Sequence, residues 1–97
     1  MSIHRYVGDY GQTIIFTFAV SLAGVTGIVI RVKKPDNAVV TWTVDPTDID
    51  PVLQRAKYTL ADRDLDVKGA YRLQGVLSWS GRRAKTAPVI LEVGEGI

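Results

Sequence analysis

Cysteine is absent from this sequence of 97 residues, and histidine occurs once, as His4. Without cysteine, the chain can form neither disulfides nor thiolate metal sites. A single histidine leaves no Cys/His cluster for zinc. A serine hydrolase would need His4 as its base and a Gly-x-Ser-x-Gly turn, which the sequence lacks. No glycine-rich phosphate-binding loop is present either. We therefore expect a protein that is not an enzyme, with no catalytic residues, no metal and no cofactor.

An excess of charge of one sign is also missing. Twelve Lys and Arg residues against ten Asp and Glu residues give a net charge of +2. That value is too small to indicate a nucleic-acid partner. Basic residues do gather at Lys33 and Lys34 and at residues 82–85, where they could contact phosphates or an acidic surface. Because no aromatic stacking residues accompany them, we interpret these groups as solubilising charge.

Three aspartates, Asp45, Asp48 and Asp50, lie in one loop. Carboxylate oxygens are the ligands that Ca²⁺ prefers, but the spacing does not match an EF-hand loop. We favour a solvated loop in which Asp50 caps one turn of helix that begins at Pro51. Whether the loop binds a cation stays open.

One long run, residues 11–30, carries no charge. Its length could span a bilayer as a helix. However, it contains three glycines and several Ser and Thr residues, and its apolar residues form two short blocks. This composition is typical of two buried strands. We therefore expect no membrane partner and keep a small membrane-anchored protein as an alternative. The N-terminus shows no signal-peptide pattern, and we expect none.

What the sequence has in abundance is alternation of period two, most of all in residues 65–79. Successive strand side chains point to opposite faces, so one face of this segment is predicted to be buried. Asp66 and Gly69, placed before Tyr71, indicate a tyrosine corner, in which the Tyr hydroxyl bonds back to the preceding loop. The predicted core is Ile30, Trp42, Tyr71, Leu73, Leu77, Trp79 and Leu91.

Six further segments read as shorter strands separated by turn residues. They are residues 3–7, 13–20, 27–33, 39–44, 56–60 and 86–93. Pro35 to Asn37 marks one hairpin and Ser80 to Arg83 another. No segment shows a sustained helical period. The sequence thus predicts one all-β domain, residues 1–97, folded as an antiparallel β-sandwich of about seven strands.

Three blocks of sequence resemble a known group of proteins as a set. The first is VGDYG at residues 7–11. The second is LAG at 22–24, followed by IVIRVKKPDN at 28–37 and VTW at 40–42. The third is YTL at 58–60, DL at 64–65 and GAYRLQ at 69–74. Together they resemble small bacteriophage tail and virion proteins, including the N-terminal domain of phage upper baseplate proteins.

This resemblance implies an immunoglobulin-like sandwich and a structural role in the tail, baseplate, neck or capsid-associated part of a particle. It also implies that the chain is in the host cytoplasm before assembly and in the virion afterwards. The implied partners are other virion proteins and further copies of the chain itself. The family's hairpin usually reads Lys-Pro-Asp-Gly, whereas this chain has Asn37 in place of the Gly. Asn tolerates a left-handed φ, so we expect the hairpin to persist. Since the sequence stops at Ile97, we expect no further fibre or baseplate region.

The segment 13–20 suggests how such contacts form. Ile14, Phe16 and Phe18 supply a core face, so the opposite face is predicted to meet a partner. The predicted contact residues are Ile15, Thr17 and Ala19, and the expected result is a homo-oligomer. The competing account is that the loops at residues 21–26 and 45–55 fold over this face. A carbohydrate-binding sandwich module, with Trp42 and Trp79 at the sugar site, is an alternative function.

Overall fold

The computed structural model describes residues 2–8 and 10–94, with side chains from residue 5 onward. The chain is all-β in this part, and its only helical element is one short 3₁₀ turn, η1 (Pro46–Asp48). No helix in the described part is long and apolar enough to cross a membrane. The strands are β1 (Ser2–Tyr6), β2 (Thr13–Thr17), β3 (Gly27–Lys33), β4 (Val39–Thr43), β5 (Ile49–Asp50), β6 (Arg55–Thr59), β7 (Gly69–Trp79), β8 (Arg82–Lys85) and β9 (Val89–Gly94).

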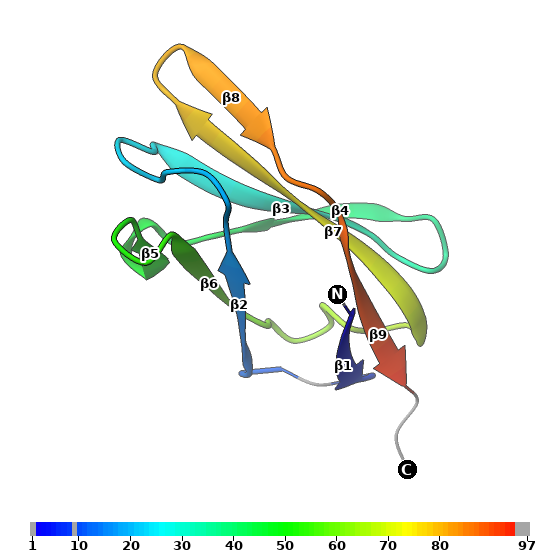
Figure 1. The fold of residues 1–97 in the computed structure, drawn as a ribbon. Coiled ribbons are helices and arrows are strands. Elements are labelled where there is room, and N and C mark those ends of the chain that lie inside the picture. The colour runs from blue at the N-terminus through cyan, green and yellow to red at the C-terminus, as the bar shows by residue number, and fades with distance from the viewer. Residues whose placement is uncertain (1, 9, 95–97) are drawn as a thin grey trace.

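Strand β7 is the centre of a curled, mixed, six-stranded sheet (Figure 1). The order is β1-β9-β7-β3-β4, and β8 pairs with the same side of β7 as β9. β1 runs parallel to β9, whereas the other pairs are antiparallel. A second antiparallel sheet has the order β2-β6-β5. The six-stranded sheet is therefore mixed, and the fully antiparallel arrangement predicted from sequence fails at the β1–β9 pair.

The core lies between the inner faces of the two sheets. Alternate residues of β3 and β7 point inward, as the period-two pattern predicts, and Leu77 and Ile30 have no exposed surface. The two sheets meet at Trp42 and Tyr58, whose rings stack with centroids 4.9 Å apart and an interplanar angle of 5°. Because β4 belongs to one sheet and β6 to the other, this contact joins the layers directly.

Tyr58 also fixes the loop that leads to β7. Its hydroxyl donates to Asp64 Oδ2 at 2.7 Å, and the same oxygen accepts from the Ala61 N–H at 2.8 Å. Burial, helped by the bond to the Asp64 carboxylate, raises the pKa of the Tyr58 phenol. The phenol therefore stays a donor throughout the physiological pH range, and the turn at residues 61–64 is held against the second sheet.

The long strand begins at Gly69, so the predicted start at residue 65 is wrong. Residues 65–68 form the loop of a tyrosine corner instead. The Tyr71 hydroxyl donates to the Val67 carbonyl at 2.6 Å and accepts from the Val67 N–H at 3.0 Å. A strand cannot run through this loop, because both backbone groups of Val67 are bonded to the Tyr71 side chain rather than to a neighbouring strand.

Local turns differ from the sequence prediction in one place and agree in another. The helical turn lies at η1, capped by Asp45, whose Oδ1 accepts from the Thr47 N–H at 2.9 Å. Asp50 caps a non-helical turn, accepting from the N–H groups of Val52 and Leu53. The predicted helix at Pro51 is therefore wrong. The β3–β4 hairpin does form, and Asn37 adopts a φ of 69°, as expected for a residue in place of glycine.

Candidate protein–protein interface

Among residues 2–8 and 10–94, no strand pairs with the second edge of β2, which we call its free edge. The described hydrogen-bonding partner of β2 is β6, and the register pairs Ile15 with Lys57 and Phe16 with Ala56. Beyond the ends of the ladder, the Leu60 N–H donates to the Gln12 carbonyl, and the Phe18 N–H donates to the Gln54 carbonyl. Since bonded and non-bonded pairs alternate in an antiparallel ladder, the backbone groups of residues 13, 15 and 17 point away from β6. They are open to a further strand.

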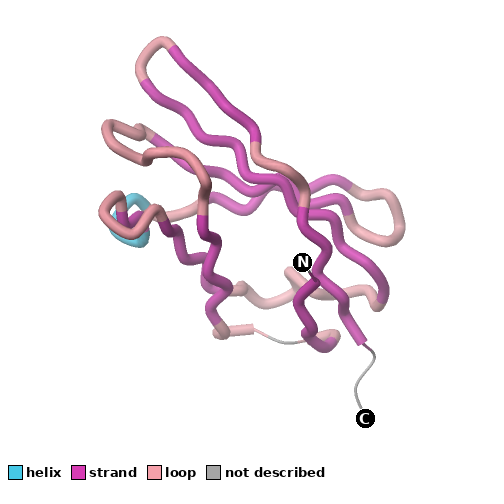
Figure 2. Tube along the Cα trace, in the orientation of Figure 1, coloured by secondary structure: helices cyan, strands magenta, loops and turns pink. Residues whose placement is uncertain are grey.

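An apolar hollow of about 370 Å³ lies beside this free edge. We call it the edge groove. One wall is formed by residues 15–19, and the other by Leu73 and Gly75 of β7 together with Thr86, Ala87 and Val89. Figure 2 shows that the chain leaves β8 as a loop before it enters β9, and this loop carries Thr86 and Ala87. The groove therefore lies between the β2 edge of one sheet and the β7–β9 part of the other.

Gly75 deepens the groove. A Cβ at this position would lie 3.1 Å from the Phe18 ring and 3.2 Å from the Thr86 side chain. Glycine thus lets the Phe18 ring and the Thr86 side chain approach the inner face of β7 closely. Phe18 is buried and Phe16 is partly buried. Both phenyl rings therefore belong to the floor of the groove rather than to its exposed rim.

The second wall is a β-bulge. Between the pairs Leu73–Val89 and Val76–Lys85, β7 has two residues, whereas the returning chain has three, residues 86–88. Thr86 fixes the bulge, because its N–H donates to the Gly75 carbonyl and its Oγ1 accepts from the Gly75 N–H, both at 2.9 Å. Pro88 has no N–H to offer. The bulge splits the predicted strand 86–93, which forms β9 only from Val89.

The predicted contact residues Ile15, Thr17 and Ala19 are all exposed, and Ile15 retains 55% of its surface. Ala19 and Val20 lie beyond the end of β2, since the strand ends at Thr17 and not at residue 20. The outer face of β2 is not a broad apolar patch either, because Lys57 lies opposite Ile15 and Arg55 lies opposite Thr17. The apolar character is concentrated at the edge groove.

One of the two covering loops does approach this face. Leu53 shares a small hollow with Ile15 and Lys57, at the turn that Asp50 caps. Leu53 itself remains exposed. In the other loop, Leu22 is fully buried and Val25 packs against the core. The loop at residues 21–26 therefore packs into the core, whereas the loop at residues 45–55 lies beside Ile15 without burying it. The free edge of β2 stays uncovered by both.

Six of the seven predicted core residues are buried: Ile30, Trp42, Tyr71, Leu73, Leu77 and Leu91. Trp79 is only partly buried, which differs from its predicted place in the core. It lies at the end of β7, where its indole N–H donates to the Ala23 carbonyl at 3.0 Å and the Arg82 guanidinium stands 4.2 Å from the ring centroid.

The two tryptophans do not form an open aromatic platform for a sugar ring. Trp42 stacks on Tyr58 between the sheets, and Arg82 covers the ring of Trp79.

The aspartate loop is organised by its own backbone. Asp45 and Asp50 each cap a turn, and the bonds from Thr47 lower the pKa of Asp45. Arg55 and Lys57 line the same hollow as Asp48 and Asp50. In the described part of the chain, no three His, Cys, Asp or Glu side chains are grouped as metal ligands.

Sequence reasoning missed the second wall of the groove. Thr86, Ala87 and Val89 were placed in a regular strand. Two signals could have marked the bulge: Gly75 inside a long strand pattern, and Pro88 near the start of the returning strand. No protein-family model, curated protein or solved structure matches the chain.

Proposed function

We propose that this chain is a non-enzymatic structural component of a phage or prophage particle that assembles through protein–protein contacts at the free edge of β2. The observation that carries the proposal is the unpaired edge beside the edge groove. Edge strands accept a further strand through main-chain bonds, and adjoining apolar pockets select its side chains. The phage context comes from the resemblance of the three sequence blocks.

We propose that the two sheets are an elaborated immunoglobulin-like sandwich. The tyrosine corner at Tyr71 and Val67 supports it, because this device recurs in such domains. The parallel β1–β9 pair is an addition at one edge. The partners are other virion proteins and further copies of the chain, and the location is the assembled virion.

Ile15→Glu is expected to abolish self-association without unfolding the domain. The new carboxylate would lie directly opposite Lys57, in a pair worth about 0.2–1 kcal/mol across two strands. The same charge would stand in the mouth of the edge groove, where an apolar partner side chain would lose its contact. The measurement is sedimentation equilibrium at micromolar concentration, with circular dichroism to check the fold.

Lys57→Glu is the matched control. It introduces the same side chain on the same face, one strand further from the free edge, so the oligomer should persist. A wild-type chain that stays monomeric at micromolar concentration would contradict self-assembly. Equal dissociation of both variants would contradict the placement of the contact at β2.

A further inference from the structure

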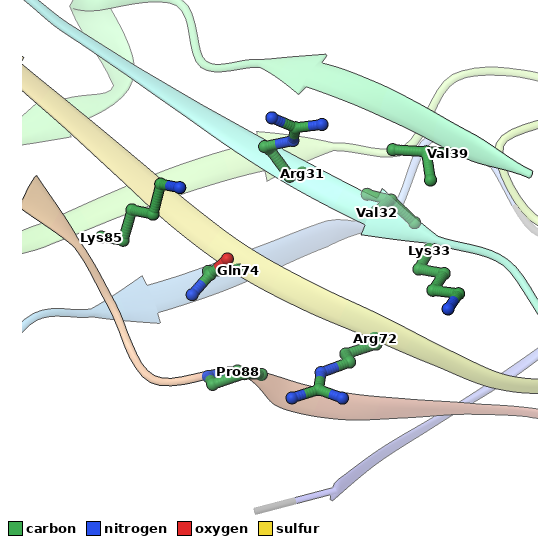
Figure 3. Close-up of a pocket in the computed structure, with 8 residues that line it drawn as sticks. All are labelled: Arg31, Val32, Lys33, Val39, Arg72, Gln74, Lys85 and Pro88. Carbon is green, nitrogen blue, oxygen red and sulfur yellow. The ribbon is translucent and has the colours of Figure 1, made fainter.

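The outer face of the six-stranded sheet gathers basic side chains that are far apart in the sequence. We call Arg31, Lys33, Arg72, Arg83 and Lys85 the basic face. The register places them together, because Lys33 pairs with Arg72, Lys85 with Val76 and Arg83 with Ser78, all on the side of β7 opposite the core. Figure 3 shows four of them around a shallow hollow of about 350 Å³, with Gln74 between them.

These cations lack an acidic partner within the described part of the chain. None of the five forms an ion pair with a described residue, and the hollow is lined by no acidic side chain. Glu92 lies on this face beyond Arg72, opposite Ala70, and Asp36 lies in the turn that follows β3. Lys33 and Arg72 stand directly opposite each other, and like charges in that arrangement are destabilising. The fold alone gains nothing from this pair.

The net charge of the whole chain conceals this asymmetry. Five of the twelve basic residues lie on the basic face, which leaves seven against the ten acidic residues for the rest of the molecule. The rest therefore has a net charge of −3, so a polyanion is attracted to the basic face more than to the molecule as a whole. The expectation of no nucleic-acid partner rested on this net charge and on the lack of aromatic stacking residues, and neither bears on how the charges are distributed over the surface.

We propose that the basic face binds the phosphate backbone of duplex nucleic acid without regard to base sequence. Three of the five cations are Arg, whose planar fork suits phosphate oxygens. Thr41 and Gln74 lie on the same face and are neutral donors of the kind that also contact phosphates. Gln74 Nε2 donates one N–H to the Thr86 carbonyl at 2.9 Å and has a second N–H to offer. The face thus offers the mixture of charged and neutral donors typical of backbone recognition.

The alternatives fit this face less well. Single-stranded nucleic acid is usually held by bases stacked on aromatic rings. The aromatic residues of β4 and β7, Trp42, Tyr71 and Trp79, all belong to the inner face. A protein partner is usually held by buried aromatic anchors, and Lys is depleted from such interfaces. Duplex phosphates need neither stacking nor anchors, because they stand on the outside of the helix.

The test is fluorescence anisotropy with a labelled duplex of about 25 base pairs and mixed sequence. If all five cations contact phosphates, log K should fall with log[salt] with a slope of about −4.5, which is a loss of about 500-fold between 50 and 200 mM salt. Arg31→Gln with Arg72→Gln should reduce the slope to about −2.7. A structural role would lower the thermal midpoint of this variant, whereas relief of the Lys33–Arg72 repulsion should leave the midpoint unchanged or raise it.

The matched control is Arg55→Gln with Lys57→Gln, which removes the same charge from the outer face of the other sheet. Binding retained by this control and weakened in the Arg31 and Arg72 variant supports the proposal. It is overturned by no binding to the duplex at 50 mM salt, by equal weakening of both variants, or by equal affinity for polyglutamate, for single-stranded DNA or for anionic lipid vesicles.

Discussion

Replacing Gly69 by alanine should lower the free energy of unfolding by about 3 kcal/mol. Gly69 begins β7 with a φ of +131°, a conformation that residues with a side chain rarely adopt. A Cβ there would also lie 2.8 Å from both Cβ and Cγ of Pro35. The proline ring cannot rotate away, so the β3–β4 hairpin and the start of β7 would have to separate. The expected fall in the thermal midpoint is about 15 °C.

Gly81→Ala separates the cost of the positive φ from the cost of the clash with Pro35. Gly81 lies in the β7–β8 turn with a φ of +77°, but a Cβ there would meet nothing within 4 Å. This variant carries only the backbone strain, about 1 kcal/mol. Thermal unfolding followed by circular dichroism compares the two. Equal losses for Gly69→Ala and Gly81→Ala would contradict the close packing of Gly69 against Pro35.

Tyr71→Phe is expected to cost about 2 kcal/mol, because both hydrogen bonds of the buried hydroxyl are lost together. The Val67 carbonyl and N–H would then lose the partner that they have in the native protein. Tyr10→Phe is the control, since Tyr10 is exposed. Chemical denaturation should show a lower midpoint for Tyr71→Phe and an unchanged one for Tyr10→Phe. An unchanged midpoint in both would show that the corner adds no stability.

Because of the same Tyr71 hydroxyl, we expect the free energy of unfolding to fall at alkaline pH. Burial raises the pKa of Tyr71 above its ordinary value of 10.0. A phenol with a raised pKa keeps its proton longer in the folded chain than in the unfolded chain. Its contribution is therefore complete below pH 10 and is lost as the pH rises through the folded-state value. Tyr71→Phe should flatten this part of the stability curve.

Much of the fold follows from the alternation of apolar and polar residues along the strands. The alternation in β3 and β7 predicts which side of each strand is buried, because a one-residue slip would turn every side chain to the wrong face. The corner was also readable, since Gly69 and Tyr71 stand two residues apart at the start of a strand. The Asn37 turn follows from the tolerance of Asn for a positive φ.

Gly75 and Pro88 signal a bulge, but they do not place it. The groove and the basic face both depend on the register between distant segments, so neither follows from the sequence. The extra residue at 86–88 could sit anywhere along the returning strand until its pairing with β7 is known. Arg31, Arg72 and Lys85 become neighbours only through the β3–β7–β8 order. The parallel β1–β9 pair joins the two ends of the described chain, and nothing local in either segment specifies it.

We propose that the chain is part of a phage particle, which it joins through the free edge of β2. The most direct measurement is quantitative mass spectrometry of density-purified particles induced from cells that carry the gene, made with the wild-type and the Ile15→Glu sequence. We predict that the wild-type chain is present at a fixed ratio to the other virion proteins and that the Ile15→Glu chain stays in the soluble fraction. Particles that lack the wild-type chain, or that take up both chains equally, would contradict the account.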